Sequence, residues 1–169
     1  RMSLTIGNAP GTDSKTSEDR VKGYKNFANK VWNITRFILE FTKDTKLDVK
    51  FNKYSEKDTV LRNERHQFIV DITKDMEEYR FYMAAEKIYH YIWHTLADII
   101  LEDSKKILKV GTESEIKSRK QFLLHTLNKC LIVLHPFMPF LTEEIWQSLD
   151  FSKNLLMVDN DILKNMRKN

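Results

Sequence analysis

Most of this chain lacks proline, and that feature constrains its fold more than any other in the sequence. After Pro10 the next prolines are Pro136 and Pro139, and the 169 residues contain only 4 glycines. Proline interrupts helices and glycine weakens their interior, so a long segment nearly free of both leaves room for long helices. The length suits one domain with a real hydrophobic core rather than two domains.

The first of these helices is predicted to begin after Ser17. The Ser17 hydroxyl can cap the helix, and Glu18 and Asp19 would lie in the first turn, where the helix dipole favours negative charge. Apolar side chains then recur at steps of three and four, which predicts one buried face on a helix of roughly 25 residues. That face comprises Tyr24, Phe27, Val31, Ile34, Ile38 and Phe41.

Two further helices are predicted in the middle of the chain. One begins at Ser55 or Asp58 and ends near Tyr79 and Arg80, where we expect a break. The next covers about residues 81–107, and small residues on its inward face would allow close packing between helices. The residues expected on that inward face are Phe81, Ala84, Ala85, Ile88, Ile92, Leu96 and Ile99.

The remaining segments complete the predicted bundle. A fourth long helix is expected over about residues 115–134 and is ended by Pro136, while Thr142 is expected to cap a short last helix. The composition of residues 1–14 predicts a loop, and strand-like alternation is confined to residues 47–51. The fold class predicted from these patterns is all-α, an antiparallel helical bundle.

Basic residues cluster in two places, although the formal net charge is only +4. Such clusters suit a polyanion, because lysine and arginine side chains that bind phosphates release condensed counterions. A solvated helix face is the alternative explanation, and charge alone does not decide between the two. The first cluster is Lys15, Arg20, Lys22, Lys25, Lys30 and Arg36, and the second is Lys105, Lys106, Lys109, Lys117, Arg119 and Lys120.

Cysteine usage and hydropathy favour a cytoplasmic location. Cys130 is the only cysteine, so no intrachain disulfide can form, which fits a reducing compartment. No apolar run reaches the ~20 residues that a membrane span requires, and no signal-peptide pattern is present. The start at Arg1 rather than at a methionine suggests a piece of a longer protein.

The string NFANKVWNITRF, residues 26–37, combines a core face with a polar face. The polar side chains at helical spacing are Asn26, Asn29, Lys30, Asn33 and Arg36. Their amides, amine and guanidinium can bind phosphates and base edges, and the Phe37 ring offers a stacking plane for an unpaired base. On these residues alone, a face that is merely solvated is the competing interpretation.

A second string, HPFMPFLTEEIWQSL at residues 135–149, is structural rather than catalytic. Its two prolines force an extended corner, and the large apolar side chains between and beside them are expected to hold that corner against the core. Trp146 would then pack the last helix against the bundle. The value of this string is that it identifies a fold.

Together the two strings resemble the anticodon-binding helical domain of class I aminoacyl-tRNA synthetases of the valine, isoleucine and leucine group, with the valyl enzymes most similar. The first string is similar to the family pattern R-N-F-x-N-K-[LV]-[WY]-N-x-x-R-F, with Lys25 in place of the frequent arginine. Residues 79–105 are similar to the family's third helix, although Ile99 and Ile100 replace a Trp-Tyr pair of the valyl form. Leu101 and Glu102 match the last two positions of that pattern, which implies a place near the anticodon, and an ordinary helix end is the competing interpretation.

The resemblance implies an anticodon-binding bundle over residues 1–150 and a C-terminal tail over residues 151–169. It also implies a tRNA partner, valine tRNA first, and the catalytic domain of the same polypeptide as a second partner. The low glycine and proline counts and the apolar stripes predict that the chain folds as a monomer. The alternatives are an isoleucyl or leucyl enzyme with the same fold, or a helical protein-interaction bundle. The residues expected to bind RNA are Arg20, Lys22, Asn26, Asn29, Lys30, Asn33, Arg36, Phe37, Leu101 and Glu102.

We expect no catalytic residue, cofactor or metal in this chain. The family's catalytic domain contains the HIGH and KMSKS signatures, and neither string occurs here. The resemblance therefore implies that ATP and Mg²⁺ bind only in a catalytic domain outside the chain. Residues 7–16 lack the glycine and lysine spacing of a phosphate loop, and no fourth ligand at fixed spacing completes a zinc site on Glu86, His90 and His94.

Overall fold

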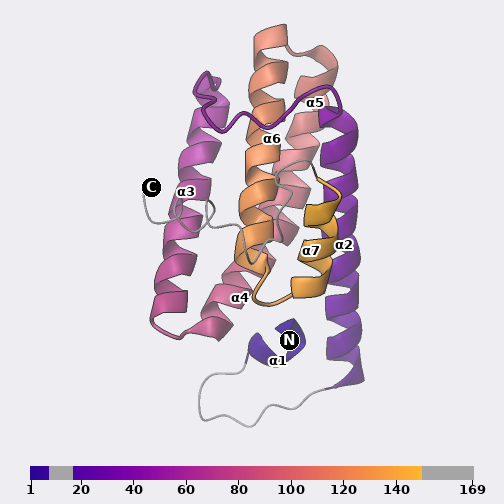
Figure 1. The fold of residues 1–169 in the computed structure, drawn as a ribbon, viewed down its shortest axis with the longest axis vertical. Helices are drawn as coiled ribbons and strands as arrows, with labels where there is room; N and C mark the ends of the chain where they lie inside the picture. The colour runs from indigo at the N-terminus through magenta and orange to yellow at the C-terminus, as the bar shows by residue number, and fades with distance from the viewer. Residues whose placement is uncertain (8–16, 150–169) are drawn as a thin grey trace.

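A computed structural model describes residues 1–7 and 17–149 of the chain. Within these residues the fold is all-α and contains no strand, which confirms the predicted fold class (Figure 1). The elements in chain order are α1 (Met2–Thr5), α2 (Glu18–Thr42), α3 (Glu56–Glu77), α4 (Phe81–His90), the π-helical segment η1 (Tyr91–Leu101), α5 (Glu102–Val110), α6 (Glu113–Leu134) and α7 (Pro139–Gln147).

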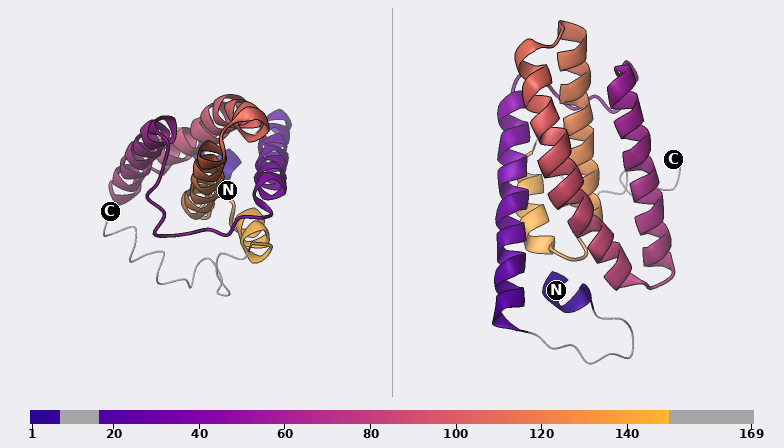
Figure 2. Two further views of the ribbon diagram at one scale, coloured as in Figure 1. Left: turned by 90° about the horizontal axis from the view of Figure 1, so that it is seen from above. Right: turned by 180° about the vertical axis from the view of Figure 1, so that it is seen from behind.

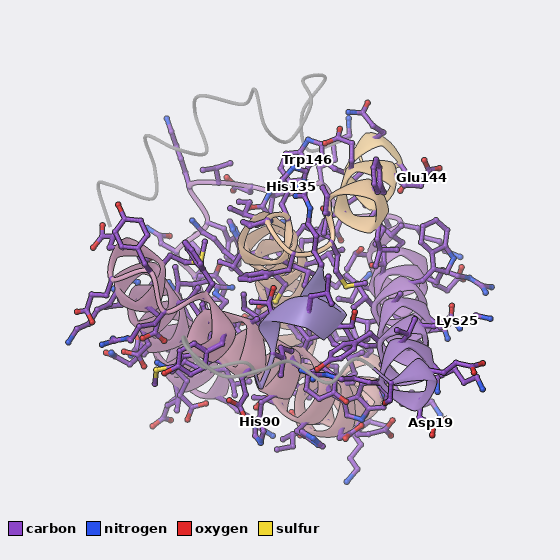
Figure 3. All side chains as sticks on the ribbon, turned by 90° about the horizontal axis from the view of Figure 1, so that it is seen from below. Asp19, Lys25, His90, His135, Glu144 and Trp146 are labelled. Carbon is purple, nitrogen blue, oxygen red and sulfur yellow. The ribbon has the colours of Figure 1, made fainter. Side chains whose placement is uncertain are left out.

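Helix α6 is the centre of the bundle. Helices α2 and α3 pack against it on opposite flanks, and the continuous helix formed by α4, η1 and α5 covers its back (Figure 2). Helix α7 packs beside α2 and α6, and the short helix α1 lies across the end of the bundle, next to α2 and α4 (Figure 3). As a result, the outward faces of α2 and α3 point to different sides of the molecule.

Three long helices begin at side-chain caps. The Ser17 hydroxyl accepts a hydrogen bond from the Arg20 amide at 3.2 Å, which confirms the predicted start of α2. Ser55, rather than Asp58, caps α3. Thr112 and Glu115 form a reciprocal capping box at the start of α6. Because each cap satisfies amides that would otherwise lack partners, these sequence signals locate helix starts well.

The core lies between α2, η1 and α6. The buried face of α2 is formed by Phe27, Val31, Ile34 and Ile38, as the apolar periodicity predicts. These side chains meet the large apolar residues of α6, where Phe122, Leu123, Leu127, Leu131 and Leu134 are all no more than 2% exposed. Burial of this continuous apolar surface is the main favourable term in folding.

The inward face predicted for the third helix is wrong at both ends. Phe81 is 42% exposed and Ile99 is 62% exposed, whereas Ile100 and Leu101 are buried. The cause for Ile99 is the π-helical hydrogen-bonding of η1, because a wider turn delays the inward face by one residue relative to an α-helix. Phe81 is the first residue of α4, directly after the turn that separates it from α3, and lies at the surface beside Tyr79.

Two predicted boundaries also need correction. Residues 2–5 form the single helical turn α1 instead of a loop, and the buried Met2 side chain anchors that turn to the core. Helix α7 begins at Pro139, not after Thr142, since proline is well suited to the first helical turn. The Thr142 hydroxyl instead donates to the Met138 carbonyl at 3.0 Å from inside the helix. The predicted tail, residues 151–169, lies outside the described residues.

The connection between α2 and α3 is held by side chains of α6. Gln121 accepts from the Asp48 amide at 3.1 Å and donates to the Lys46 carbonyl at 2.7 Å. The His125 ring bonds to the Asp48 carbonyl at 2.9 Å. In a strand these backbone groups would form hydrogen bonds with a neighbouring strand. Here side chains of α6 satisfy them instead, so residues 47–51 form an irregular segment that is held in place.

The predicted break between the second and third helices is confirmed. Tyr79 adopts a positive φ of 59°, which turns the chain sharply between α3 and α4. Asp75, only 1% exposed, accepts hydrogen bonds from Arg80 at 2.7 Å and from Lys87 at 2.6 Å and so ties the two helices together. In the described ranges no helix combines the length and apolar character needed to cross a bilayer.

Candidate nucleic-acid interface

The candidate interface is a polar stripe along the outward face of α2. Lys22, Asn26, Asn29, Asn33 and Arg36, here called the α2 stripe, are all exposed. At 3.6 residues per turn their spacing places them on one side of the helix, away from the buried face. Figure 3 shows that Asp19 and Lys25 also lie on the outer side of α2. The structure thus brings five of the ten predicted RNA-binding residues together.

The α2 stripe carries groups that can form new hydrogen bonds at little cost. Among the described residues, none accepts from or donates to the side-chain amides of the three asparagines, so water must satisfy them in the free protein. Lys22 pairs with Glu18 at 3.1 Å, but both side chains are more than 60% exposed. Such an exposed pair contributes little stability and can be exchanged for another anion. The stripe is therefore open to a ligand.

Lys30 lies beside the stripe, on the seam where α2 meets η1. Its Nζ atom is 3.2 Å from Asp98 Oδ1 and 5.4 Å from the centre of the Trp93 ring. The Lys30 side chain is 34% exposed, so part of its charge is neutralised within the fold. A phosphate at this amine would have to compete with Asp98.

Phe37 lies on the same seam and packs, partly buried, against the core. Its ring is 4.4 Å from that of Phe41, and Lys105 Nζ is 5.7 Å from its centre. Lys105 in turn pairs with Glu102 at 2.5 Å. Phe37 and Glu102, which are 65 positions apart in the sequence, therefore come to the same end of the seam through Lys105. An aromatic plane, a cation and a carboxylate there can meet an unstacked base.

Two of the predicted contact residues are occupied within the fold. Leu101 is only 6% exposed and packs in the core of η1, so its side chain cannot meet RNA in this structure. The Arg20 guanidinium donates to the Ile6 carbonyl and contacts Tyr24, and so joins α2 to the N-terminal segment. Burial raises the pKa of the Tyr24 hydroxyl, and Arg20 partly offsets that rise. Arg20 acts in the fold as an anchor.

One aromatic residue at this interface was missed by the sequence analysis. Trp32 is 39% exposed and lies on the flank of the α2 stripe opposite to Phe37. A half-exposed tryptophan next to exposed amides is suited to stacking on a base. Its position outside the apolar periodicity of Phe27, Val31 and Ile34 was the signal that could have identified it.

The second basic cluster does not form one open patch. Arg119 is fully buried, and its Nε donates to Asp58 at 2.6 Å while Nη1 donates to Asp103 at 2.8 Å. Lys120 pairs with Asp44 at 2.6 Å, and Lys105 is held by Glu102 and Phe37. The interpretation of Arg119 as part of a polyanion-binding cluster is wrong, because helices α3 and α5 supply carboxylates that the sequence spacing does not reveal.

In the Arg119 cluster, the buried guanidinium of Arg119 bonds to two carboxylates. The cluster comprises Arg119, Asp58, Asp103, Ser104 and Ser118. Burial on its own would raise the pKa of Asp103, but hydrogen bonds from Lys57 and Arg119 outweigh it and hold that pKa below its usual value. Ser118 donates to the second oxygen of Asp58, and Ser104 lies 3.0 Å from Arg119 Nη1. The cluster joins α3, α5 and α6 and therefore fixes the position of α5, which carries Glu102 and Lys105.

No part of the described chain gathers a set of ligands for a metal. The rings of His90 and His94 are 4.8 Å apart, yet within residues 1–7 and 17–149 no group of three or more histidine, cysteine, aspartate or glutamate residues could hold an ion. His94 Nδ1 instead faces Asp98 at 3.6 Å. Figure 3 places His90 and His135 on opposite sides of the bundle, so these two rings do not share a site.

Comparison with known proteins gives a consistent result. Residues 58–165 match the family described as the anticodon-binding domain of tRNA ligase. The chain is similar to the valine–tRNA ligase of Pelagibacter ubique strain HTCC1062, with 39% identity over 170 residues that cover 95% of this chain and 19% of that protein. The valine–tRNA ligase of Fervidobacterium nodosum is 38% identical over 94% of this chain and 18% of its own length.

A third valine–tRNA ligase is similar to the chain at a lower sequence identity. The valine–tRNA ligase of Latilactobacillus sakei is 32% identical over 93% of this chain and 18% of its own length. The chain therefore spans about a fifth of the length of the curated relatives that it matches.

Proposed function

The chain belongs to the family of anticodon-binding domains of tRNA ligases, and we propose that it binds the anticodon stem-loop of a valine tRNA as a module of a valine–tRNA ligase. The α2 stripe is the observation that carries this proposal. Three asparagines and two cations are exposed along one rigid helix whose opposite face is buried in the core. Similarity to valine–tRNA ligases along nearly the whole chain favours valine tRNA over its sister tRNAs.

Different residues of the interface contact different parts of the RNA. Lys22 and Arg36 bind phosphates, which positions the loop without reading its sequence. Asn29 and Asn33 reach base edges, because an amide both donates and accepts and so can match more than one edge. The ring of Phe37 stacks on a base, and Glu102 accepts a hydrogen bond from an exocyclic amine such as that of cytosine.

The pair formed by Lys105 and Glu102 supports this end of the interface. Their side chains are 45% and 60% exposed, so the pair can open and release the carboxylate to a base. Lys105 then stays near the Phe37 ring, where its charge favours a phosphate or a stacked base. The buried Arg119 cluster holds α5 in place beneath them, so recognition does not depend on a mobile loop.

Catalysis belongs, in this proposal, to the rest of the ligase. ATP and Mg²⁺ bind in its catalytic domain, and this chain contributes tRNA binding in a cytoplasmic, monomeric enzyme. The family resemblance and the absence of the HIGH and KMSKS strings support this division of labour. The α2 stripe would then position the tRNA so that its acceptor end reaches the catalytic domain.

Binding of fluorescent anticodon stem-loop RNA, measured by anisotropy at several salt concentrations, tests the proposal. Replacing Lys22 or Arg36 by alanine should weaken binding to every tRNA and lower the slope of log K against log salt by ~0.7–0.9 per phosphate contact. Lys53→Ala, which removes an exposed lysine of the α2–α3 connection, is the matched control and should change neither quantity.

Specificity is tested with the same assay and three RNAs. The valine stem-loop should bind more tightly than the isoleucine and leucine stem-loops, and Asn33→Ala should reduce that difference. Equal affinity for the three loops would favour a sister ligase or a non-specific interface. Binding that does not change with salt, or that Lys53→Ala weakens as much as Arg36→Ala does, would refute the role of the α2 stripe.

A further inference from the structure

A groove on the other flank of the bundle carries an unbalanced positive charge. It has a volume of about 570 Å³ and lies along α3, with Lys129 of α6 closing one side. Its lining includes Arg62, Arg65, Lys74 and Lys129, against the single carboxylate of Glu77. None of these four cations forms an ion pair with any described residue. By contrast, Arg119, Lys120, Lys57 and Lys87 all have carboxylate partners.

Arg65 distinguishes this groove from a group of isolated surface lysines, because its side chain is nearly buried and held in place by α6. The residue is only 8% exposed, yet no carboxylate neutralises its guanidinium within the described chain. The Thr126 hydroxyl of α6 accepts one hydrogen bond from Nη1 at 3.0 Å, and the Phe122 ring lies 5.3 Å from Cζ. These two contacts fix the side chain at the groove wall, where its remaining N–H groups are left for a partner in the groove.

The environment of the neighbouring groups agrees with this geometry. Burial lowers the pKa of the Arg65 guanidinium, and burial followed by the charge of Arg65 lowers that of Lys129. Both groups are therefore partly dehydrated, and the charge of Arg65 acts on Lys129 across the groove. An anion bound in the groove would remove this penalty, because a partly buried charge gains more from a partner than an exposed one does.

From these observations we infer that the α3–α6 groove, formed by Arg62, Arg65, Lys74 and Lys129, is a second binding site for phosphate groups. The planar fork of arginine binds two phosphate oxygens at once, and lysine adds a mobile point charge, so the set suits a multiply charged oxyanion better than a single carboxylate. The volume is that of a small-ligand site and admits a pyrophosphate or two successive phosphates of an RNA strand. This site is separate from the α2 stripe, since α2 and α3 lie on opposite flanks of α6.

Binding of inorganic pyrophosphate and of a short single-stranded oligouridylate to the whole chain tests this inference. Amide resonances of α3 and α6 should shift in nuclear magnetic resonance spectra, and pyrophosphate should raise the melting temperature beyond the effect of sodium chloride at equal ionic strength. The double substitution Arg62→Gln and Lys129→Gln should weaken pyrophosphate binding at least about tenfold. Lys53→Gln, outside the groove, should weaken it less than about twofold.

The two ligands identify the source of the phosphate. Oligouridylate that displaces pyrophosphate from the groove assigns the site to an RNA backbone, whereas pyrophosphate binding alone assigns it to a free phosphate compound. Arg36→Ala should leave pyrophosphate binding unchanged, so failure of the groove and failure of the α2 stripe are distinguishable. The inference is overturned if the resonance shifts lie elsewhere, if Lys53→Gln has the same effect as the groove variant, or if an acidic peptide of equal charge binds the groove more tightly than pyrophosphate.

Discussion

Replacing Arg119 by alanine should destabilise the fold and leave the cations of the α2 stripe in place. The guanidinium is fully buried and pairs with Asp58 at 2.6 Å, and Asp58 itself is only 1% exposed. Removing one partner of such a pair leaves an uncompensated buried charge and costs about 3–5 kcal/mol. For a chain of this size each kcal/mol moves the melting temperature by about 2–4 °C, so the expected decrease is about 6–20 °C.

Thermal melts followed by far-ultraviolet circular dichroism, together with urea denaturation, measure this loss. Lys117→Ala is the matched control, because Lys117 is exposed on the same helix two residues earlier, and it should change stability by less than about 0.5 kcal/mol. Stem-loop binding by Arg119→Ala, measured well below its melting temperature, should keep the salt slope of the unaltered chain, because the phosphate contacts proposed for Lys22 and Arg36 lie on α2. An unchanged melting temperature with weaker, less salt-sensitive RNA binding would show that Arg119 is a phosphate contact and that the burial argument fails.

Three other outcomes are expected. Phe37→Leu keeps an apolar side chain on the seam but removes the stacking plane, so anisotropy should show a loss of about 1–3 kcal/mol in stem-loop binding with little change in melting temperature; a large stability loss with unchanged loop discrimination would return Phe37 to the core. Hydrogen bonds from Lys87 and Arg80 outweigh the effect of burial and lower the pKa of Asp75. The contribution of Asp75 to stability is therefore complete above its usual pKa of 3.8 and is lost as the pH falls further. Asp75→Asn should flatten that part of the pH profile of stability measured by urea denaturation. Burial lowers the pKa of His135, so its neutral form stabilises the fold above pH 6.5 and that contribution is lost as the pH falls below it; His135→Asn should remove this slope, and an identical slope in the variant would refute the assignment.

Local signals in the sequence predicted most of the helices. The helix caps at Ser17 and Ser55 depend only on residues that are close together in the sequence, and so does the apolar repeat of α2. A single sequence therefore reveals them. The same holds for the exposed amides of the α2 stripe, because a helix with one buried face necessarily exposes the opposite one. The roles of these amides in RNA binding stay a prediction, since exposure permits a contact without identifying the ligand.

Long-range partners explain what the sequence did not reveal. Arg119 stands among lysines in the chain and resembles them, yet its carboxylate partner Asp58 is 61 positions away. Lys30 similarly meets Asp98 across 68 positions. Whether a basic residue is free for a polyanion depends on such tertiary neighbours, and the pattern of one short segment contains no information about them.

The π-helical segment η1 connects the fold to the candidate interface. An α-helix continued from Ile92 would place Ile99 inward, but the wider turns of η1 bury Ile100 and Leu101 and expose Ile99 instead. This delay of about one residue sets the phase of α5, which begins at Glu102. It leaves the Glu102 side chain 60% exposed and brings Lys105 to 5.7 Å from the ring of Phe37 on the neighbouring helix. The irregular hydrogen bonding within the bundle therefore determines which side chains of α5 come close to α2, where we propose that an RNA loop binds.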